Sequence, residues 1–152
     1  MSDMFHYVAC GLPNVWLSNG FTETVDEAGE PFFSIAEVRD LHRAIGHSLT
    51  EKESVLTGDE FRFLRTELRM SRRTLAELLG YSDEAIKKWE SGENRIHKLA
   101  DANLRQLFLE GQSEDGTLKA LLTQIKDLER EERKLCFEET QKGWEGKVDQ
   151  CA

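Results

Sequence analysis

One stretch of the sequence decides the fold: SRRTLAELLGYSDEAIKKWESG, residues 71–92. Ser71 and Ser82 each precede a run of residues with apolar side chains at helical spacing. Serine is a preferred N-cap because its hydroxyl accepts a hydrogen bond from a free helix N–H. Gly80 and Gly92 follow the two runs, and glycine adopts without steric cost the left-handed backbone that ends a helix. The stretch therefore predicts two short helices joined by a tight turn at Gly80.

The spacing within this stretch favours one way of packing the two helices. Ala76, Gly80 and Ile86 are the fifth, ninth and fifteenth residues counted from Arg72. The small residue allows the helices to cross closely, the glycine makes the turn, and the branched residue anchors the second helix on the first. A second helix held in this way stands out from the core and fits the major groove of DNA.

The flanking sequence predicts two further helices, which complete a helical domain over residues 56–111. Thr57 is followed three residues later by Glu60, and this pair forms a capping box at the start of the preceding helix. The following helix ends at Gly111, and apolar residues at helical spacing give both helices an inward face. The predicted core of the domain consists of Phe61, Leu64, Leu68, Leu75, Leu79, Ile86, Trp89, Ile96, Ala100, Leu104, Leu107 and Phe108.

Residues 68–92 resemble the helix-turn-helix of the Cro/C1 (XRE) family of regulators. They match the pattern S-x-x-x-L-A-x-L-L-G-x-S-x-x-x-I-x-x-W-E-x-G. The resemblance implies a lambda-repressor-like fold that binds double-stranded DNA, usually as a homodimer because two half-sites lie about one helical turn apart. No enzyme activity and no cofactor are expected, since the sequence has no P-loop, G-x-S-x-G or H-E-x-x-H motif.

The same resemblance implies roles for individual side chains. Base contacts are expected near the start of the helix that follows Ser82, from Asp83, Glu84, Lys87 and Lys88. Lysine can donate to guanine O6 and N7, and a carboxylate can accept from cytosine N4. The two acidic residues also have a simpler interpretation, because they complement the positive end of the helix.

Contacts to DNA phosphates are expected at the start of both helices and in the residues around them. The resemblance assigns them to Arg72, Arg73 and Ser82, with Arg62, Arg65, Arg69 and Arg95 as additional candidates. Phosphate contacts give affinity and register but do not select a sequence. For any one arginine the alternative is a solvated or salt-bridged surface group.

Residues 1–55 are predicted to form a small strand-rich unit that ends in a helix. Phe21–Val25 and Phe32–Ile35 flank a turn with glycine and proline, which predicts a β-hairpin. The helix is indicated by apolar residues at helical spacing, namely Val38, Leu41, Ala44, Ile45 and Leu49. The aromatic residues of the unit, Trp16, Phe32 and Phe33, favour a small core over an exposed patch that binds a partner.

The N-terminal unit, with Tyr7, Cys10 and Gly11, resembles that of HigA/MqsA-type antitoxins. Those antitoxins hold zinc with two CxxC pairs, and a structural zinc site needs four ligands. This chain has only Cys10 there, with His6, His42 and His47, so no metal is expected. The resemblance implies the antitoxin of a type II toxin–antitoxin pair, which represses its own promoter. A stand-alone transcriptional regulator, or a protein-interaction module without a toxin partner, is the alternative.

The net charge of −9 argues against a nucleic-acid binder until it is divided along the chain. Residues 1–56 contain 3 Lys and Arg against 9 Asp and Glu, and residues 113–152 contain 7 against 10. The helical domain between them is balanced, with 10 against 10 in residues 57–112. The acidity therefore lies mainly outside the predicted DNA-binding domain, and the acidic N-terminal unit would complement a small basic toxin.

Residues 112–152 are predicted to form a linker and one long amphipathic helix from Thr117 to about Lys142. Its apolar seam consists of Leu118, Leu121, Ile125, Leu128 and Leu135. This seam either docks on its own domain or forms the homodimer contact, which we favour. Residues 143–152 are expected to be frayed. The predicted fold class is mainly α, with a small β-containing N-terminal unit.

Cysteine usage and hydropathy suggest a cytoplasmic protein. Cys10, Cys136 and Cys151 lie far apart and are odd in number, which favours reduced thiols over a disulfide framework. No apolar run approaches the roughly 18 residues that a membrane span needs, and no secretory signal is recognisable at the N-terminus.

Overall fold

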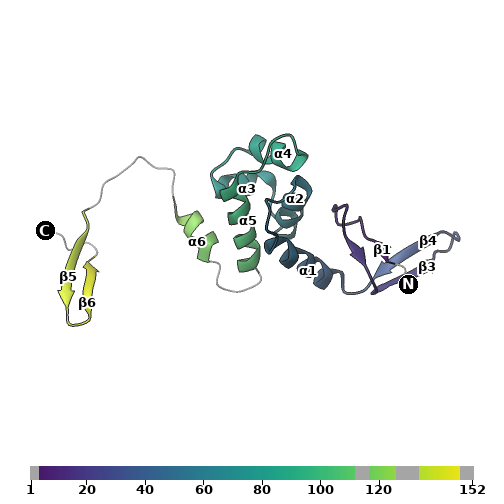
Figure 1. Ribbon diagram of the computed structural model, residues 1–152, viewed down its shortest axis with the longest axis horizontal. Helices are drawn as coiled ribbons and strands as arrows, with labels where there is room; N and C mark the ends of the chain where they lie inside the picture. The colour runs from purple at the N-terminus through teal and green to yellow at the C-terminus, as the bar shows by residue number, and fades with distance from the viewer. Residues whose placement is uncertain (1–3, 112–116, 126–133, 148–152) are drawn as a thin grey trace.

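A computed structural model of the chain describes residues 4–111, 117–125 and 134–147 (Figure 1). The N-terminal strands are β1 (Phe5–His6), β2 (Trp16–Leu17), β3 (Phe21–Val25) and β4 (Pro31–Ile35). They are followed by α1 (Val38–Thr50), α2 (Gly58–Glu67), α3 (Arg72–Leu79), α4 (Asp83–Ser91) and α5 (Lys98–Gly111). The remaining elements are α6 (Thr117–Gln124), β5 (Cys136–Thr140) and β6 (Gly143–Lys147).

The ends of the central helices are fixed by the residues that the sequence indicates. Thr57 and Glu60 form the capping box of α2, in which each side chain accepts a hydrogen bond from the other residue's backbone N–H. Ser71 caps α3 and Ser82 caps α4 through their hydroxyls. Gly80 ends α3 with a φ of 81°, in the left-handed region that favours glycine.

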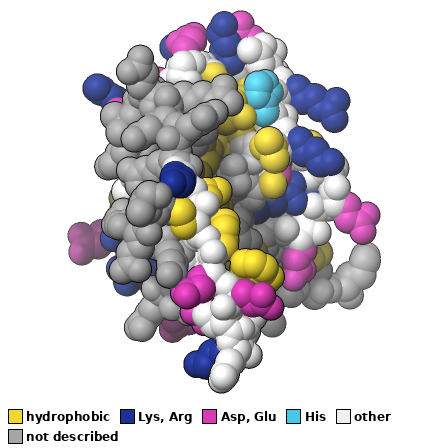
Figure 2. Space-filling model, turned by 90° about the vertical axis from the view of Figure 1, so that its left-hand side faces the viewer, with side chains coloured by type: hydrophobic (Ala, Val, Ile, Leu, Met, Phe, Trp, Pro, Cys, Tyr) yellow, Lys and Arg dark blue, Asp and Glu magenta, His cyan; other side chains and the backbone are white. Residues whose placement is uncertain are grey.

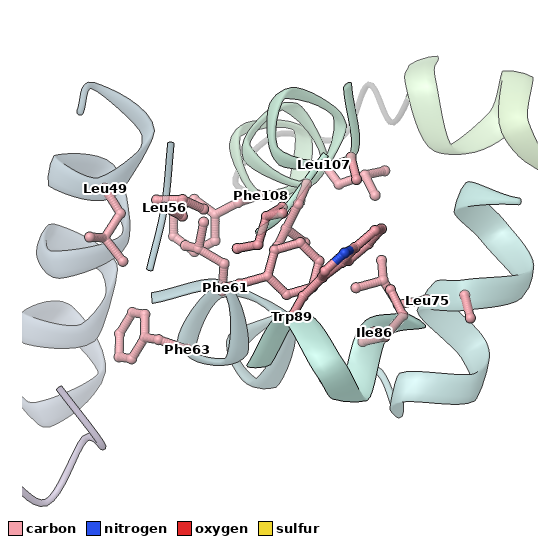
Figure 3. Close-up of a cluster of buried hydrophobic side chains, with 14 of the residues drawn as sticks. Leu49, Leu56, Phe61, Phe63, Leu75, Ile86, Trp89, Leu107 and Phe108 are labelled. Atoms are coloured by element: carbon pink, nitrogen blue, oxygen red, sulfur yellow. The ribbon is translucent and has the colours of Figure 1, made fainter. Parts of the chain in front are cut away.

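The helices share one hydrophobic core, shown in Figure 3. The largest fully buried side chains are Phe61, Leu64, Leu75, Ile86, Leu104 and Phe108. Phe61 packs edge-on against Trp89, with their ring centroids 5.8 Å apart. Leu49 of α1 and Leu12 of the N-terminal unit also join this core. Helix α1, which sequence analysis grouped with the N-terminal strands, therefore packs against the helical domain.

A buried ion pair ties α5 to the segment that precedes α2. Asp101 accepts a hydrogen bond from the backbone N–H of Leu56 at 2.6 Å and pairs with Arg105 one turn further along α5. The guanidinium of Arg105 also donates to the backbone carbonyls of Lys52 and Ser54. These bonds pair the buried carboxylate of Asp101 and hold the connection between α1 and α2, although Nε of Arg105 makes no hydrogen bond of its own.

The N-terminal unit contains the predicted β3–β4 hairpin, with Phe21 opposite Ile35 and Val25 opposite Pro31. Phe33 packs against Phe5 and Phe21, with centroid distances of 4.5 and 6.4 Å. The expectation of an aromatic core in this unit is nevertheless wrong for its largest side chains. Trp16, Phe32 and Phe33 are 53%, 48% and 44% exposed, because two-stranded sheets provide no second layer to cover them.

The long C-terminal helix expected over Thr117 to about Lys142 is a wrong prediction. Helix α6 ends at Gln124, and Cys136–Thr140 pairs with Gly143–Lys147 in an antiparallel hairpin. The expectation of frayed residues is therefore also wrong for β6, while Leu128 and residues 148–152 lie outside the described residues. Cys136 is disulfide-bonded, which contradicts the expectation of reduced thiols, whereas Cys10 is a free cysteine.

Candidate nucleic-acid interface

Helix α4 lies across α2 and α3 and buries one face against them. Ile86, Trp89 and Glu90 form the buried face, at the i, i+3 and i+4 spacing of one helix side. Asp83, Glu84 and Lys87 are exposed on the opposite side, within the first two turns of the helix. The start of α4 is thus the part of the helix that is free to contact a ligand.

The four residues predicted to contact bases do not have equal access to solvent. Asp83, Glu84 and Lys87 are exposed, and Glu84 and Lys87 are three residues apart, which makes them neighbours on the helix surface. Lys88, four residues after Glu84, is half-buried and lies in the last turn of α4. The structure therefore brings Glu84 and Lys87 together on one surface and places Lys88 beside it.

The residues predicted to contact phosphates surround the start of α4. Arg72 of α3 lies 3.8 Å from Asp83, between Nε and Oδ1, and this exposed ion pair connects the two helices. Arg73 pairs with Glu77 within α3 at 3.5 Å. Such exposed pairs contribute little to stability, so both guanidiniums can be recruited by a stronger anion. The Ser82 hydroxyl accepts from the N–H of Ala85 and keeps its own O–H free to donate.

Glu90 is a buried carboxylate that sequence analysis did not single out. It accepts two hydrogen bonds from Arg65 of α2, from Nε at 2.6 Å and from Nη2 at 2.9 Å. Arg65 also donates to the backbone carbonyl of Met70, and Arg62 lies 3.4 Å from Glu90. Arg65 is therefore engaged inside the fold and is not free to contact DNA. The pairing fixes α4 relative to α2.

A close backbone approach fixes the same two helices at their other contact. A Cβ atom added to Gly58 would lie 2.5 Å from the backbone carbonyl oxygens of Trp89 and Glu90. Only glycine permits this approach of the first turn of α2 to the last turn of α4. Glycine at position 58 is thus required by packing, a reason that the sequence alone did not reveal.

The electrostatics of the helical domain depend on which charges are buried. Glu60, Glu90 and Asp101 are buried and pair with Lys52, Arg65 and Arg105. Burial alone would raise the pKa of Glu60, but hydrogen bonds from Lys52 and from Thr57 lower it below the usual value. On the face shown in Figure 2, basic and acidic side chains are intermixed. Around the start of α4 itself, Arg72 pairs with Asp83 and Arg73 pairs with Glu77, so the candidate interface combines cations with anions.

The histidines and the cysteine of the N-terminal half do not form a metal site. In residues 4–111, 117–125 and 134–147, no group of three or more His, Cys, Asp or Glu side chains could hold a metal ion. His6 stacks on Trp16 with ring centroids 4.1 Å apart, and His42 bonds to Glu67 and to Tyr7. The Cys10 thiol donates weakly to the carbonyl of Tyr7. These groups have structural partners.

Comparison with known proteins identifies the central helices. Residues 61–98 match a family model described as Helix-turn-helix, which covers most of α2, all of α3 and α4, and the start of α5. No curated protein and no solved structure matched the chain. Among the described residues, no helix is long and apolar enough to cross a membrane. The match confirms the helix-turn-helix expected from residues 68–92, a DNA-binding unit of transcriptional regulators.

Proposed function

We propose that this protein is a sequence-specific transcriptional regulator that inserts the start of α4 into the major groove of DNA. The observation that carries the proposal is the arrangement of α4 itself. Its buried face is held by the core and by the pairing of Glu90 with Arg65, while Glu84 and Lys87 remain exposed on the free face. A rigidly held helix with free polar side chains on its first turns is the geometry by which helix-turn-helix proteins contact bases.

The proposed contacts divide into those that select a sequence and those that position the protein. Lys87 donates to guanine, with Lys88 beside it, and Glu84 or Asp83 accepts from cytosine N4. Arg72, Arg73 and the hydroxyl of Ser82 contact phosphates at the edge of the groove. Asp83 is released from Arg72 in this complex, since their separation of 3.8 Å marks a weak, exposed pair.

The regulator acts in our proposal as a homodimer that represses its own promoter. A single helix-turn-helix contacts only one half-site, and two copies double the sequence that is recognised. Helix α6 packs on α3 and α5 and leaves Leu121 and Ile125 53% and 64% exposed. These two side chains are the dimer contact that we favour.

An antitoxin role is the more specific form of the proposal. The N-terminal unit over residues 4–37 contains five acidic residues and no lysine or arginine. Its exposed aromatic side chains Trp16, Phe32 and Phe33 accompany this negative charge. A small basic toxin would complement both features. Co-expression with the neighbouring gene tests this role: a co-purifying basic protein supports an antitoxin, and its absence favours a stand-alone regulator.

The DNA-binding proposal is tested by titrating the purified chain with the duplex upstream of its own gene and with a scrambled duplex of equal composition. We expect the upstream duplex to bind about a thousandfold more tightly at physiological salt. Equal, weak and strongly salt-dependent binding to both duplexes would leave only contacts to phosphates and would contradict sequence-specific regulation.

A further inference from the structure

A small hollow lies between α1, the end of α2 and α5, and its lining is rich in cations. Its volume is about 210 Å³. Arg39, His42 and Arg43 of α1 line it together with Glu67 and Arg69. Arg39 and Arg43 are four residues apart, so their side chains lie on one face of α1. Three arginines from two parts of the chain therefore line the same hollow.

The backbone at Arg69 is unusual for its residue type. Arg69 follows α2 with a φ of 58°, in the left-handed region that glycine occupies most readily. The N–H of Arg69 bonds to the carbonyl of Thr66 and the N–H of Met70 to that of Arg65, so the residue occupies the usual glycine position of a helix end. An arginine here is conformationally costly, which suggests that its side chain has a role beyond ending the helix.

The three arginines of the hollow also lack the partners that most arginines of this fold have. Within the described part of the chain, no carboxylate lies within salt-bridge distance of Arg39, Arg43 or Arg69. The only carboxylate in the lining, Glu67, is engaged by Nδ1 of His42 at 2.6 Å. With a neutral histidine, the lining thus carries a formal charge of +2.

We propose that this hollow binds a phosphate group. Guanidinium forks match the oxygens of phosphate in pairs, and the excess charge of the lining matches a dianion. The volume lies below the 300–1,000 Å³ typical of pockets for drug-sized ligands, so the site takes the phosphate and little else. The proposal goes beyond DNA recognition by α4, because the site is formed by α1, α2 and α5.

The phosphate comes either from a small ligand or from the DNA backbone, and the site includes a histidine that is bonded to the N-terminal unit. Because an ionised carboxylate only accepts, Nδ1–H of His42 donates to Glu67, and Nε2 then accepts from the hydroxyl of Tyr7 at 2.8 Å. Tyr7 belongs to the N-terminal unit. A bound phosphate would therefore lie beside the histidine that connects this unit to the helical domain.

The test is calorimetric titration of the full chain with pyrophosphate and with inorganic phosphate, at constant ionic strength set with sodium chloride. Arg69→Gly removes one guanidinium and suits the left-handed backbone, so this variant is expected to melt at or above the wild-type temperature. Arg43→Ala is the second variant, and Lys98→Ala, outside the hollow, removes the same charge elsewhere. We expect saturable binding that each arginine variant weakens about tenfold or more and Lys98→Ala does not.

The calorimetry has an outcome that overturns the proposal, and one further measurement completes the test. No heat above the sodium chloride control, or equal affinity in wild type, Arg69→Gly and Arg43→Ala, would overturn the proposal. Repeating the DNA titration with Arg69→Gly then identifies the source of the phosphate. Weaker DNA binding with a salt slope reduced by about one assigns the site to the backbone, whereas unchanged DNA binding assigns it to a small ligand. The calorimetric result contains no DNA, so it stands or fails separately from the proposed function.

Discussion

A single buried carboxylate, Glu90, determines how α4 is held. Glu90 has a side chain only 3% exposed and is bonded by Arg65 from another helix, 25 residues earlier in the sequence. A buried charge of this kind is costly unless it is paired, so removal of one partner leaves the other unsatisfied. Glu60 of α2 is also a buried, paired carboxylate. It accepts hydrogen bonds from the backbone N–H of Thr57 in the capping box and from Nζ of Lys52.

Replacing Glu90 with glutamine should therefore lower the free energy of unfolding by about 2–4 kcal/mol, because the neutral amide cannot compensate the charge of Arg65. Chemical denaturation measures this change. Glu93→Gln is the matched control, since Glu93 is exposed and its substitution should change stability by less than about 0.5 kcal/mol. Equal stability of the two variants would mean that the pairing does not hold α4.

Glu60 predicts a pH dependence of stability. Its pKa is lower in the folded chain than the ordinary value of 4.5, so its contribution is complete above that pH. The contribution is lost as the pH falls through the lower, folded pKa. Glu60→Gln should lower the free energy of unfolding by about 1 kcal/mol at pH 7, with a difference from wild type that shrinks as the pH falls below 4.5. A difference that stays constant over this range would exclude the ionised carboxylate as its cause.

At the scale of elements, the sequence predicts a helix correctly where the residues that end it bond to their own neighbours. It does not reveal contacts between segments that are far apart in the chain. Ser71, Ser82 and Gly80 mark helix ends through bonds to their own neighbours, so the sequence predicted α3 and α4. The contact of Gly58 with α4 joins distant segments and has no local signal. The exposure of Glu84 and Lys87 follows from helical period, whereas the pairing of Glu90 with Arg65 does not.

The C-terminal segment shows that apolar residues at helical spacing can predict a helix that continues into residues that form strands. Leu118, Leu121 and Ile125 fit a helix, and the apolar seam through Leu128 and Leu135, without proline or glycine, predicts its continuation to about Lys142. The hairpin has one local signal in the sequence, the glycine at position 143, which adopts a φ of 109° directly after the turn. A single glycine is a weaker signal than an apolar seam, and the sequence therefore favours the helix.

Packing of α2 on α4 should not tolerate a methyl group at position 58. Gly58→Ala places Cβ against two backbone carbonyls, which cannot move as a flexible side chain can, and should cost about 1–3 kcal/mol. Gly111→Ala is the control, because its Cβ would meet only the end of the Leu68 side chain, at 3.3 Å. Thermal melts compare the two, and a Gly58→Ala variant as stable as Gly111→Ala would contradict this packing.

In the whole molecule, the proposed DNA binding depends more on where the charged side chains lie than on the net charge. The net charge of −9 is concentrated outside residues 57–112, and within them Glu60, Glu90 and Asp101 are buried with cationic partners. The cations left at the surface include Lys87 on α4, Arg72 and Arg73 on α3, and the three arginines of the hollow. An acidic chain can therefore present the local charges that DNA binding and phosphate binding require.

The most direct measurement of the central claim is the ratio of affinities for the upstream and scrambled duplexes in a Lys87→Ala variant, with Lys98→Ala as the charge-matched control. If Lys87 contacts a base, its loss should reduce this ratio about tenfold or more, while Lys98→Ala should leave it unchanged. Equal reduction of affinity for both duplexes, with the ratio preserved, would contradict base recognition by α4.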